Sequence, residues 1–321
     1  MAALSESVLQ PDIVDLRELR ADALEPLLDE EIRTWDATLD WDFRKSADLV
    51  RRFVDLRALN GCALLDGRQV VGYAYFVLEE HKGLIGDLYI RREYQSVDGE
   101  NQLLGAVLDE MIGTPHLARI ESQLMLVDSF AGRRLPGARF LKSHLRDFMV
   151  ADLSQAALPQ GRVRHRAFIE KWAEQYHEQA AHLIAAAYLA HVDSSINDQY
   201  RSQAGARRFL YNIVQYPGCG TFFRPASFVA FDLDGRLCGL CLTSLVAPEI
   251  GHITQICVGS WVRGTGLGYE LLRQSLEALR DAGCRKVSLT VTDSNRDAIG
   301  LYERTGFVTR RQFSAYVWEG F

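Results

Sequence analysis

A repeat at a spacing of 168 residues is the feature of this sequence that most restricts its fold. The tripeptide Asp-Gly-Arg occurs at 66–68 and again at 234–236, each time between short apolar segments. Such a pattern is typical of a tight turn that joins two antiparallel strands. The same spacing aligns the apolar residues 88–90 with 256–258, and two adjacent leucines at 103–104 with 271–272. A hairpin, a strand and a helix in one register predict two copies of a single domain.

The composition allows two domains with cores of ordinary size. The chain has 321 residues, of which 48% are hydrophobic and 24% are charged. We expect the copies to span residues 1–155 and 160–321, because Pro159, Gln160 and Gly161 interrupt the pattern between them. A net charge of −6 argues against a nucleic-acid partner and suits a cationic one.

Nothing in the sequence predicts a membrane or secretory segment. No apolar run reaches the ~18 residues that a membrane span requires. The N-terminus, with Glu6 and Asp12, lacks the basic-then-apolar pattern of a signal peptide. We therefore expect a cytoplasmic protein that has no membrane partner.

The second copy contains a strand, a glycine-rich turn and a helix in succession. Residues 253–258 are apolar and β-branched, and residues 270–280 alternate leucines and charges at helical spacing. Between them lies Arg263-Gly264-Thr265-Gly266-Leu267-Gly268. Glycines let a ligand approach the backbone, the start of a helix attracts phosphate, and an arginine adds a charged donor. This turn predicts a site for a phosphorylated cofactor, without the spacing of a dinucleotide fingerprint or a P-loop.

The sequence after the turn narrows the choice of cofactor. A predicted strand at 286–291 precedes an N-x-x-A-x-x-L-Y-x-x-x-G-F pattern, formed by Asn295, Ala298, Leu301, Tyr302, Gly306 and Phe307. Together with R-x-x-G-x-G, this pattern resembles the GCN5-related N-acetyltransferase (GNAT) family. The resemblance implies an α/β (α+β) fold of two tandem domains, each with a mixed, mostly antiparallel central sheet flanked by helices. It also implies transfer of an acyl group from acyl-CoA to an amine.

The cofactor that the resemblance implies is acetyl-CoA or another acyl-CoA. Its diphosphate would lie on the turn, its pantetheine arm along the preceding strand and its thioester near the second motif. The residues concerned are Ile256, Cys257, Val258, Arg263, Gly264, Thr265, Gly266, Leu267, Gly268, Asn295 and Tyr302. We expect no metal, because Cys238 and Cys241 have no second Cys/His pair spaced for zinc.

Acyl transfer to an amine needs a base, a donor for the oxyanion and an acid for the leaving thiolate. By resemblance Tyr302 is the acid and the N–H of Val258 is the oxyanion donor, although Tyr302 also fits a packing role. His252 is the favoured base, and Glu249 is the next candidate, directly or through water. A histidine at a strand start that bonds a carbonyl is the alternative. Strand alternation predicts that His252, Thr254, Ile256 and Val258 share one face.

The polar segment 191–201 follows a predicted helix. In GNAT folds the loop between the first two helices overlies the acceptor site, so Asp193, Asp198 and Tyr200 are candidates to contact the acceptor's ammonium. A solvated loop with a helix cap is the alternative. We expect a small-molecule or peptide amine as acceptor and direct transfer in a ternary complex. The sequence does not specify the amine or the oligomeric state.

The first copy differs at the turn. The 168-residue spacing places Gln95, Asp98 and Glu100 where the second copy has Arg263, Gly266 and Gly268. Two like charges about 4 Å apart repel by ~4 kcal/mol at an intermediate dielectric. We therefore expect this degenerate copy not to bind CoA in the usual way and to be structural, or to form one wall of the acceptor cleft. A non-catalytic acyl-CoA-binding or regulatory protein on the same scaffold is the alternative function.

Overall fold

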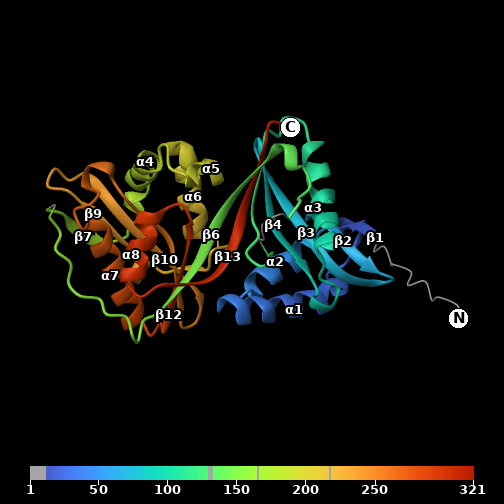
Figure 1. Ribbon diagram of the computed structural model, residues 1–321, viewed down its shortest axis with the longest axis horizontal. Coiled ribbons are helices and arrows are strands. Elements are labelled where there is room, and N and C mark those ends of the chain that lie inside the picture. The colour runs from blue at the N-terminus through green and yellow to red at the C-terminus, as the bar shows by residue number, and fades with distance from the viewer. Residues whose placement is uncertain (1–11, 129–132, 165, 217) are drawn as a thin grey trace, which may run out of the picture. The chain divides into compact units, whose positions relative to one another are not determined.

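The computed structural model describes residues 12–321 except 129–132, 165 and 217, and the chain divides into two compact units. Unit 1 comprises the described residues up to 38 together with 43–143 and 314–321, and unit 2 comprises 39–42 and 144–313. Figure 1 labels their helices and strands. Within the described ranges, no helix is both long and apolar enough to cross a membrane.

The sheet of unit 1 has the strand order β1-β2-β3-β4-β5-β13. Neighbouring strands are antiparallel, except that β4 and β5 are parallel. One core includes leucines of α3 and Trp318 of β13. The strands are β1 (Asp12–Asp15), β2 (Asn60–Asp66), β3 (Gln69–Glu79), β4 (Lys82–Ile90), β5 (Arg119–Gln123) and the end of β13 (Val308–Glu319), and the helices are α1 (Ala21–Leu39), α2 (Arg44–Asp55) and α3 (Val97–Ile112).

The sheet of unit 2 has the order β6-β12-β11-β10-β9-β7, with β8 beside β10, and its one parallel pair among the described residues is β11 with β12. One core includes residues of α7 and α8, and a second includes residues of α4 and α6. Figure 1 labels these four helices. The strands are β6 (Leu141–Asp152), β7 (Phe168–Lys171), β8 (Thr221–Phe222), β9 (Phe228–Phe231), β10 (Leu237–Ala247), β11 (Ile250–Val258) and β12 (Lys286–Thr292). The helices are α4 (His177–Ala187), α5 (Asp193–Ile196), α6 (Gln203–Gln215), α7 (Leu267–Asp281) and α8 (Arg296–Arg304). In both units the sheet is mixed and mostly antiparallel, which confirms the predicted fold class.

Corresponding strands of the two units keep the spacing found in the sequence. The β3–β4 hairpin and the β10–β11 hairpin begin and end 168 residues apart. The Asp-Gly turns are present in both copies, and Gly67 and Gly235 have the positive φ angles that such turns require. The last strands, β6 and β13, are each 12 residues long and lie 167 residues apart.

The division into units differs from the expected boundary at 155–160. From His144 onward β6 belongs to unit 2, where it pairs with β12, and from Ser314 onward β13 belongs to unit 1, where it pairs with β5. The final strand of each sequence copy thus completes the sheet of the other unit. The hydrogen bonds between strands decide to which unit β6 and β13 belong. The composition of the sequence does not predict this assignment.

A β-bulge at Thr254 corrects one prediction about the site. Residues 252 and 253 pair with Ser244 and Thr243, but Gln255 pairs with Leu242, so Thr254 is an extra residue. The alternation therefore reverses beyond the bulge. His252 shares its face of the sheet with Gln255, and not with Ile256 and Val258 as predicted.

Candidate active site

Strands β11 and β12 separate partway along their length. They pair only between Ile250–Ile253 and Lys286–Leu289. β11 then continues to Val258 and β12 to Thr292, so the ends of two neighbouring strands diverge. The divergence leaves one edge of β11 without a strand partner, next to the turn that leads into α7.

The backbone N–H of Val258 belongs to this unpartnered edge. The N–H of Gly259 donates to the carbonyl oxygen of Cys238 in β10 (2.8 Å). Because N–H groups alternate sides along a strand, the N–H of Val258 is directed away from β10. This direction suits the predicted oxyanion donor, which stays a prediction.

The glycine-rich turn leads directly into α7. Gly264 and Gly266 have φ angles of 72° and 91°, and a Cβ on Gly264 would meet open space. Gly266 caps α7 without a side-chain hydrogen bond, so the first N–H groups of the helix have no side-chain partner at the cap. Open space beside unsatisfied N–H groups and a helix dipole fits the diphosphate of CoA.

Arg263 is tied to the preceding helix. One Nη donates to the carbonyl oxygen of Ala187, the last residue of α4 (2.8 Å). A cation at this position is favoured by the negative end of the helix dipole. Its charge stays beside the turn, and a contact with phosphate remains a prediction.

The segment before β7 packs against the same turn. The N–H of Arg164 donates to the carbonyl oxygen of Thr265 (2.8 Å). The carbonyl oxygen of Arg162 lies 2.6 Å from the place where a Cβ on Gly266 would be. A side chain at position 266 is therefore excluded by neighbouring backbone as well as by the φ angle.

Tyr302 lies in α8 at the edge of the core and is 7% exposed. Its ring packs against Phe307, and its hydroxyl makes no hydrogen bond within the described part of the chain. Burial raises the pKa of Tyr302, and the nearby Cys241 and Asp193 raise it further. The phenol is therefore protonated at neutral pH, as an acid must be.

Asp193 begins α5 and lies close to Tyr302. Its Oδ1 accepts a hydrogen bond from Oγ1 of Thr292, at the divergent end of β12 (2.5 Å). Its other oxygen is 3.8 Å from Nδ1 of His191, and Nε2 of His191 is 3.3 Å from Nδ2 of Asn295. Asn295, predicted to lie near the cofactor, caps α8 with its side chain, so its structural role is clear and its contact with the cofactor stays a prediction.

Tyr200 contacts the face of β11 that carries Gln255. The hydroxyl of Tyr200 donates to Oε1 of Gln255 (3.2 Å), and Nε2 of Gln255 donates to the hydroxyl of Tyr188 (2.9 Å). The two tyrosine rings stack with centroids 4.4 Å apart. Asp198, the third acceptor candidate, begins the short 3-10 helix η5 (Asp198–Arg201) two residues before Tyr200.

His252 lies where β11 and β12 begin to diverge. Its Nδ1 is 2.9 Å from Oγ of Ser288, and that hydroxyl is 3.4 Å from the carbonyl oxygen of Gly251. If the hydroxyl donates to the carbonyl, Nδ1–H donates to the hydroxyl, which leaves Nε2 as the acceptor. The ring packs against Trp41, and burial lowers its pKa to about 4.

Glu249 does not lie at the divergent end. It precedes β11 in the turn after β10, at the far end of the strand from Val258. Its side chain is half exposed and pairs with Arg285 (2.5 Å). This surface ion pair accounts for Glu249, and the structure does not bring it to the cleft as the predicted second base.

Sequence reasoning did not single out Tyr188, His191, Gln255 and Thr292. It also missed Arg146 of β6, which lies opposite Thr292 and donates from Nη2 to Oγ1 of Thr290 (3.2 Å). None of them belongs to a motif. The one signal available was that Thr292 directly follows the strand predicted at 286–291 and precedes the second motif.

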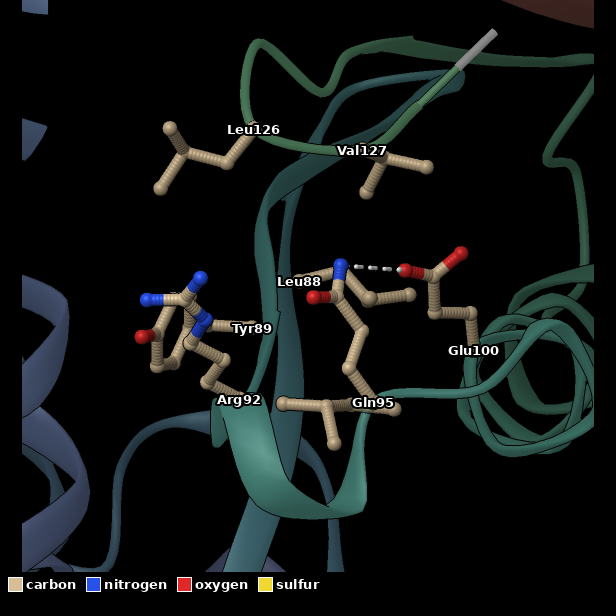
Figure 2. Close-up of a pocket in the computed structure, with 8 residues that line it drawn as sticks. Leu88, Tyr89, Arg92, Gln95, Glu100, Leu126 and Val127 are labelled. Carbon is tan, nitrogen blue, oxygen red and sulfur yellow. Dashed lines mark hydrogen bonds between the residues drawn. The ribbon is translucent and has the colours of Figure 1, made fainter. Parts of the chain in front are cut away.

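The corresponding region of unit 1 is filled. A pocket of about 30 Å³, which is room for one water, remains between β4, α3 and residues 126–127. Figure 2 shows Gln95 and Glu100 joined across it by a hydrogen bond (3.4 Å). The Glu100 carboxylate is also paired with buried Arg133 (2.6 Å), and Ser96 caps α3 through the N–H of Gly99. The helix start that would hold phosphate is occupied by the unit's own side chains.

Comparison with known proteins agrees with this geometry. Residues 189–307 match the family model described as Acetyltransferase (GNAT) family. This segment of the chain, within unit 2, is thus a domain of the GNAT family. A mycothiol acetyltransferase of Thermobispora bispora is 29% identical over 250 residues, covering 76% of this chain and 78% of that protein.

Two further comparisons separate sequence likeness from fold likeness. A mycothiol acetyltransferase of Thermomonospora curvata is 40% identical over 86 residues, and this match covers 27% of the present chain and only 29% of that relative. A tandem GNAT protein from the clavulanic acid biosynthesis pathway has a TM-score of 0.58 at 15% identity, with coverage of 97% and 98%. The tandem architecture inferred from the repeat is confirmed.

Proposed function

We propose that this protein is an acyl-CoA-dependent N-acyltransferase whose unit 2 acylates a primary amine directly within a ternary complex, with acetyl-CoA as the donor. The observation that carries the proposal is the divergence of β11 and β12. A glycine-rich turn with open space beside Gly264 lies next to the divergent ends, and so does Tyr302, whose hydroxyl is protonated. The mycothiol acetyltransferase relatives support the reaction class, and the acceptor of this chain is a separate question.

The residues around the divergent strands divide the work of acyl transfer. Acyl-CoA supplies an activated thioester when bound, and the turn at 263–268 with the edge of β11 would hold it. The N–H of Val258 would stabilise the oxyanion. Tyr302 would give a proton to the leaving thiolate.

His252 is the proposed base. A pKa of about 4 keeps the ring uncharged at neutral pH and makes it a weak base, and with the proton on Nδ1 the ring would accept a proton at Nε2. Asp193, next to the opening, would hold the amine as an ammonium before that proton leaves.

Unit 1 is proposed to be structural with respect to CoA. The Glu100–Arg133 ion pair and the capped start of α3 support this role, because both occupy groups that would otherwise meet phosphate.

The test combines binding with turnover. Calorimetry with acetyl-CoA should give one site per chain, and release of the CoA thiol should occur with at least one member of a panel of primary amines. Tight binding without turnover on any amine would instead support a sensor of acyl-CoA. Absence of binding would remove the proposal.

A further inference from the structure

We propose that the amine acceptor of unit 2 carries a carboxylate and that Arg146 binds it. This inference rests on the proposed function and specifies its acceptor class as an amino carboxylate, such as an amino acid. It starts from a buried cation that the reaction described above does not use.

Arg146 is buried and has no counterion among the described residues. It lies on β6 opposite Thr292 of β12 and is 9% exposed. Nη2 donates to Oγ1 of Thr290 (3.2 Å), while the buried Nε has no hydrogen-bond partner in the part of the chain that the structure describes. No carboxylate lies within ion-pair distance of this guanidinium among the residues that the structure describes, and the neighbouring Asp147 bonds Gln312 instead. Burying a charge without a partner is strongly unfavourable, so a ligand that supplies the partner is expected.

The carboxylate of Asp193 is held near Arg146, on the same face of β12. Asp193 bonds Thr292, as Arg146 bonds Thr290, and these threonines are two residues apart in β12. Residues i and i+2 of a strand face the same side about 7 Å apart. The two charges are thus anchored side by side, yet they do not pair with each other.

This spacing fits a zwitterion between them. The ammonium would meet Asp193, and the carboxylate would accept hydrogen bonds from Nε and an Nη of Arg146, the paired geometry that guanidinium groups favour. One guanidinium balances one carboxylate, whereas a phosphate dianion would need a second cation. Both Arg146 and Asp193 lie close enough to Tyr302 to influence its ionisation, so a ligand between them would lie at the reaction centre.

The test compares matched acceptors and matched variants. L-amino acids and β-alanine, each set against its carboxamide, are assayed as acceptors with acetyl-CoA. We expect at least one acid to react, with kcat/KM about 100-fold above that of its amide. Arg146→Gln should remove this difference by lowering kcat/KM for the acid alone, and Arg146→Lys should restore part of it. Calorimetry should show unchanged affinity of both variants for acetyl-CoA.

A second readout does not depend on turnover or on the stability of one variant. The N-acetyl derivative of the preferred acid should raise the melting temperature of the wild-type protein, and the N-acetyl amide should not. Arg146→Lys should lose most of that shift. Equal use of acids and amides, turnover of other amines only, or an Arg146→Gln variant with unchanged kcat/KM would each overturn the inference. Failure of the wild-type protein to bind acetyl-CoA would instead overturn the proposed function.

Discussion

Tyr302 has the surroundings of an acid and those of a packing residue at once. Its ring contacts Phe307 in the core, while its hydroxyl is unbonded within the described residues and its pKa is raised by burial. Packing depends on the ring alone, whereas proton donation needs the hydroxyl. Substitution by phenylalanine separates the two roles.

We predict that Tyr302→Phe lowers kcat by roughly 100-fold or more, the range for loss of a general acid. The affinity for acetyl-CoA and the melting temperature should remain close to wild type, because the ring stays in place. Stopped-flow release of the CoA thiol measures kcat, and calorimetry measures the affinity for acetyl-CoA. Full activity would leave Tyr302 with a packing role only.

The buried ring of His252 predicts how stability depends on pH. Its folded pKa of about 4 is below the ordinary histidine value of 6.5, so the stability it contributes is complete above pH 6.5 and is lost as the pH falls toward 4. Between pH 7 and pH 5 the wild-type protein should lose about 2 kcal/mol of unfolding free energy that His252→Gln does not lose. Urea denaturation at both pH values measures the difference. Equal losses would mean that the ring is not buried as the structure shows.

The sequence predicted those residues of the site that belong to local motifs better than those that come from distant segments. Gly264, Gly266 and Tyr302 belong to motifs, and the structure places all three around the divergent strands. His252 was found, but its face was wrong because a bulge at Thr254 inserts one residue into β11. Arg146 was invisible, since its strand lies over a hundred residues away in the sequence.

The strand–turn–helix element from β11 to α7 requires glycine for two different reasons, a positive φ angle and a lack of space for a side chain. Gly264 has a positive φ but open space around it, whereas Gly266 has a positive φ and backbone within 2.6 Å of its would-be Cβ. These two positions therefore form a matched pair in the same turn.

We predict that Gly264→Ala costs about 1 kcal/mol of stability, the strain of a left-handed residue with a side chain. Gly266→Ala should cost more, because the turn or the segment at 162–164 must also shift, and it should weaken acetyl-CoA binding at least tenfold. Thermal denaturation and calorimetry on both variants test the contrast. Equal effects on stability would contradict the clash at position 266.

Over the whole molecule, the units of the structure differ from the two sequence copies in their last strands. The end of each copy belongs to the other unit. β13 has Phe313 in unit 2 and Trp318 in unit 1, and both side chains are fully buried. Trp318 also donates from Nε1 to the carbonyl oxygen of Pro136 (3.0 Å), a residue of the first copy. One strand thus places a fully buried side chain in each unit, five residues apart.

We predict that Trp318→Ala and Phe313→Ala each cost about 3–5 kcal/mol, as large-to-small changes in a core do. The former should accelerate amide hydrogen exchange in β2 to β4, and the latter in β10 to β12. Exchange mass spectrometry resolves these segments. If both variants loosened the same strands, the division of β13 between the units would be wrong.

The sequence by itself determined the two copies, their hairpins, the glycine-rich turn of the second copy and the replacement of its glycines in the first copy. All of these depend on residues close together in the chain or on a fixed spacing between copies. The tertiary structure alone decided which strand completes which sheet, where the bulge lies and which distant side chains surround Tyr302. Pairing between strands far apart in sequence depends on hydrogen bonds that any residue except proline can make, so it leaves no pattern to read. The buried guanidinium of Arg146, which has no ion-pair partner among the described residues, and with it the proposed acceptor class, therefore became visible only in the folded chain.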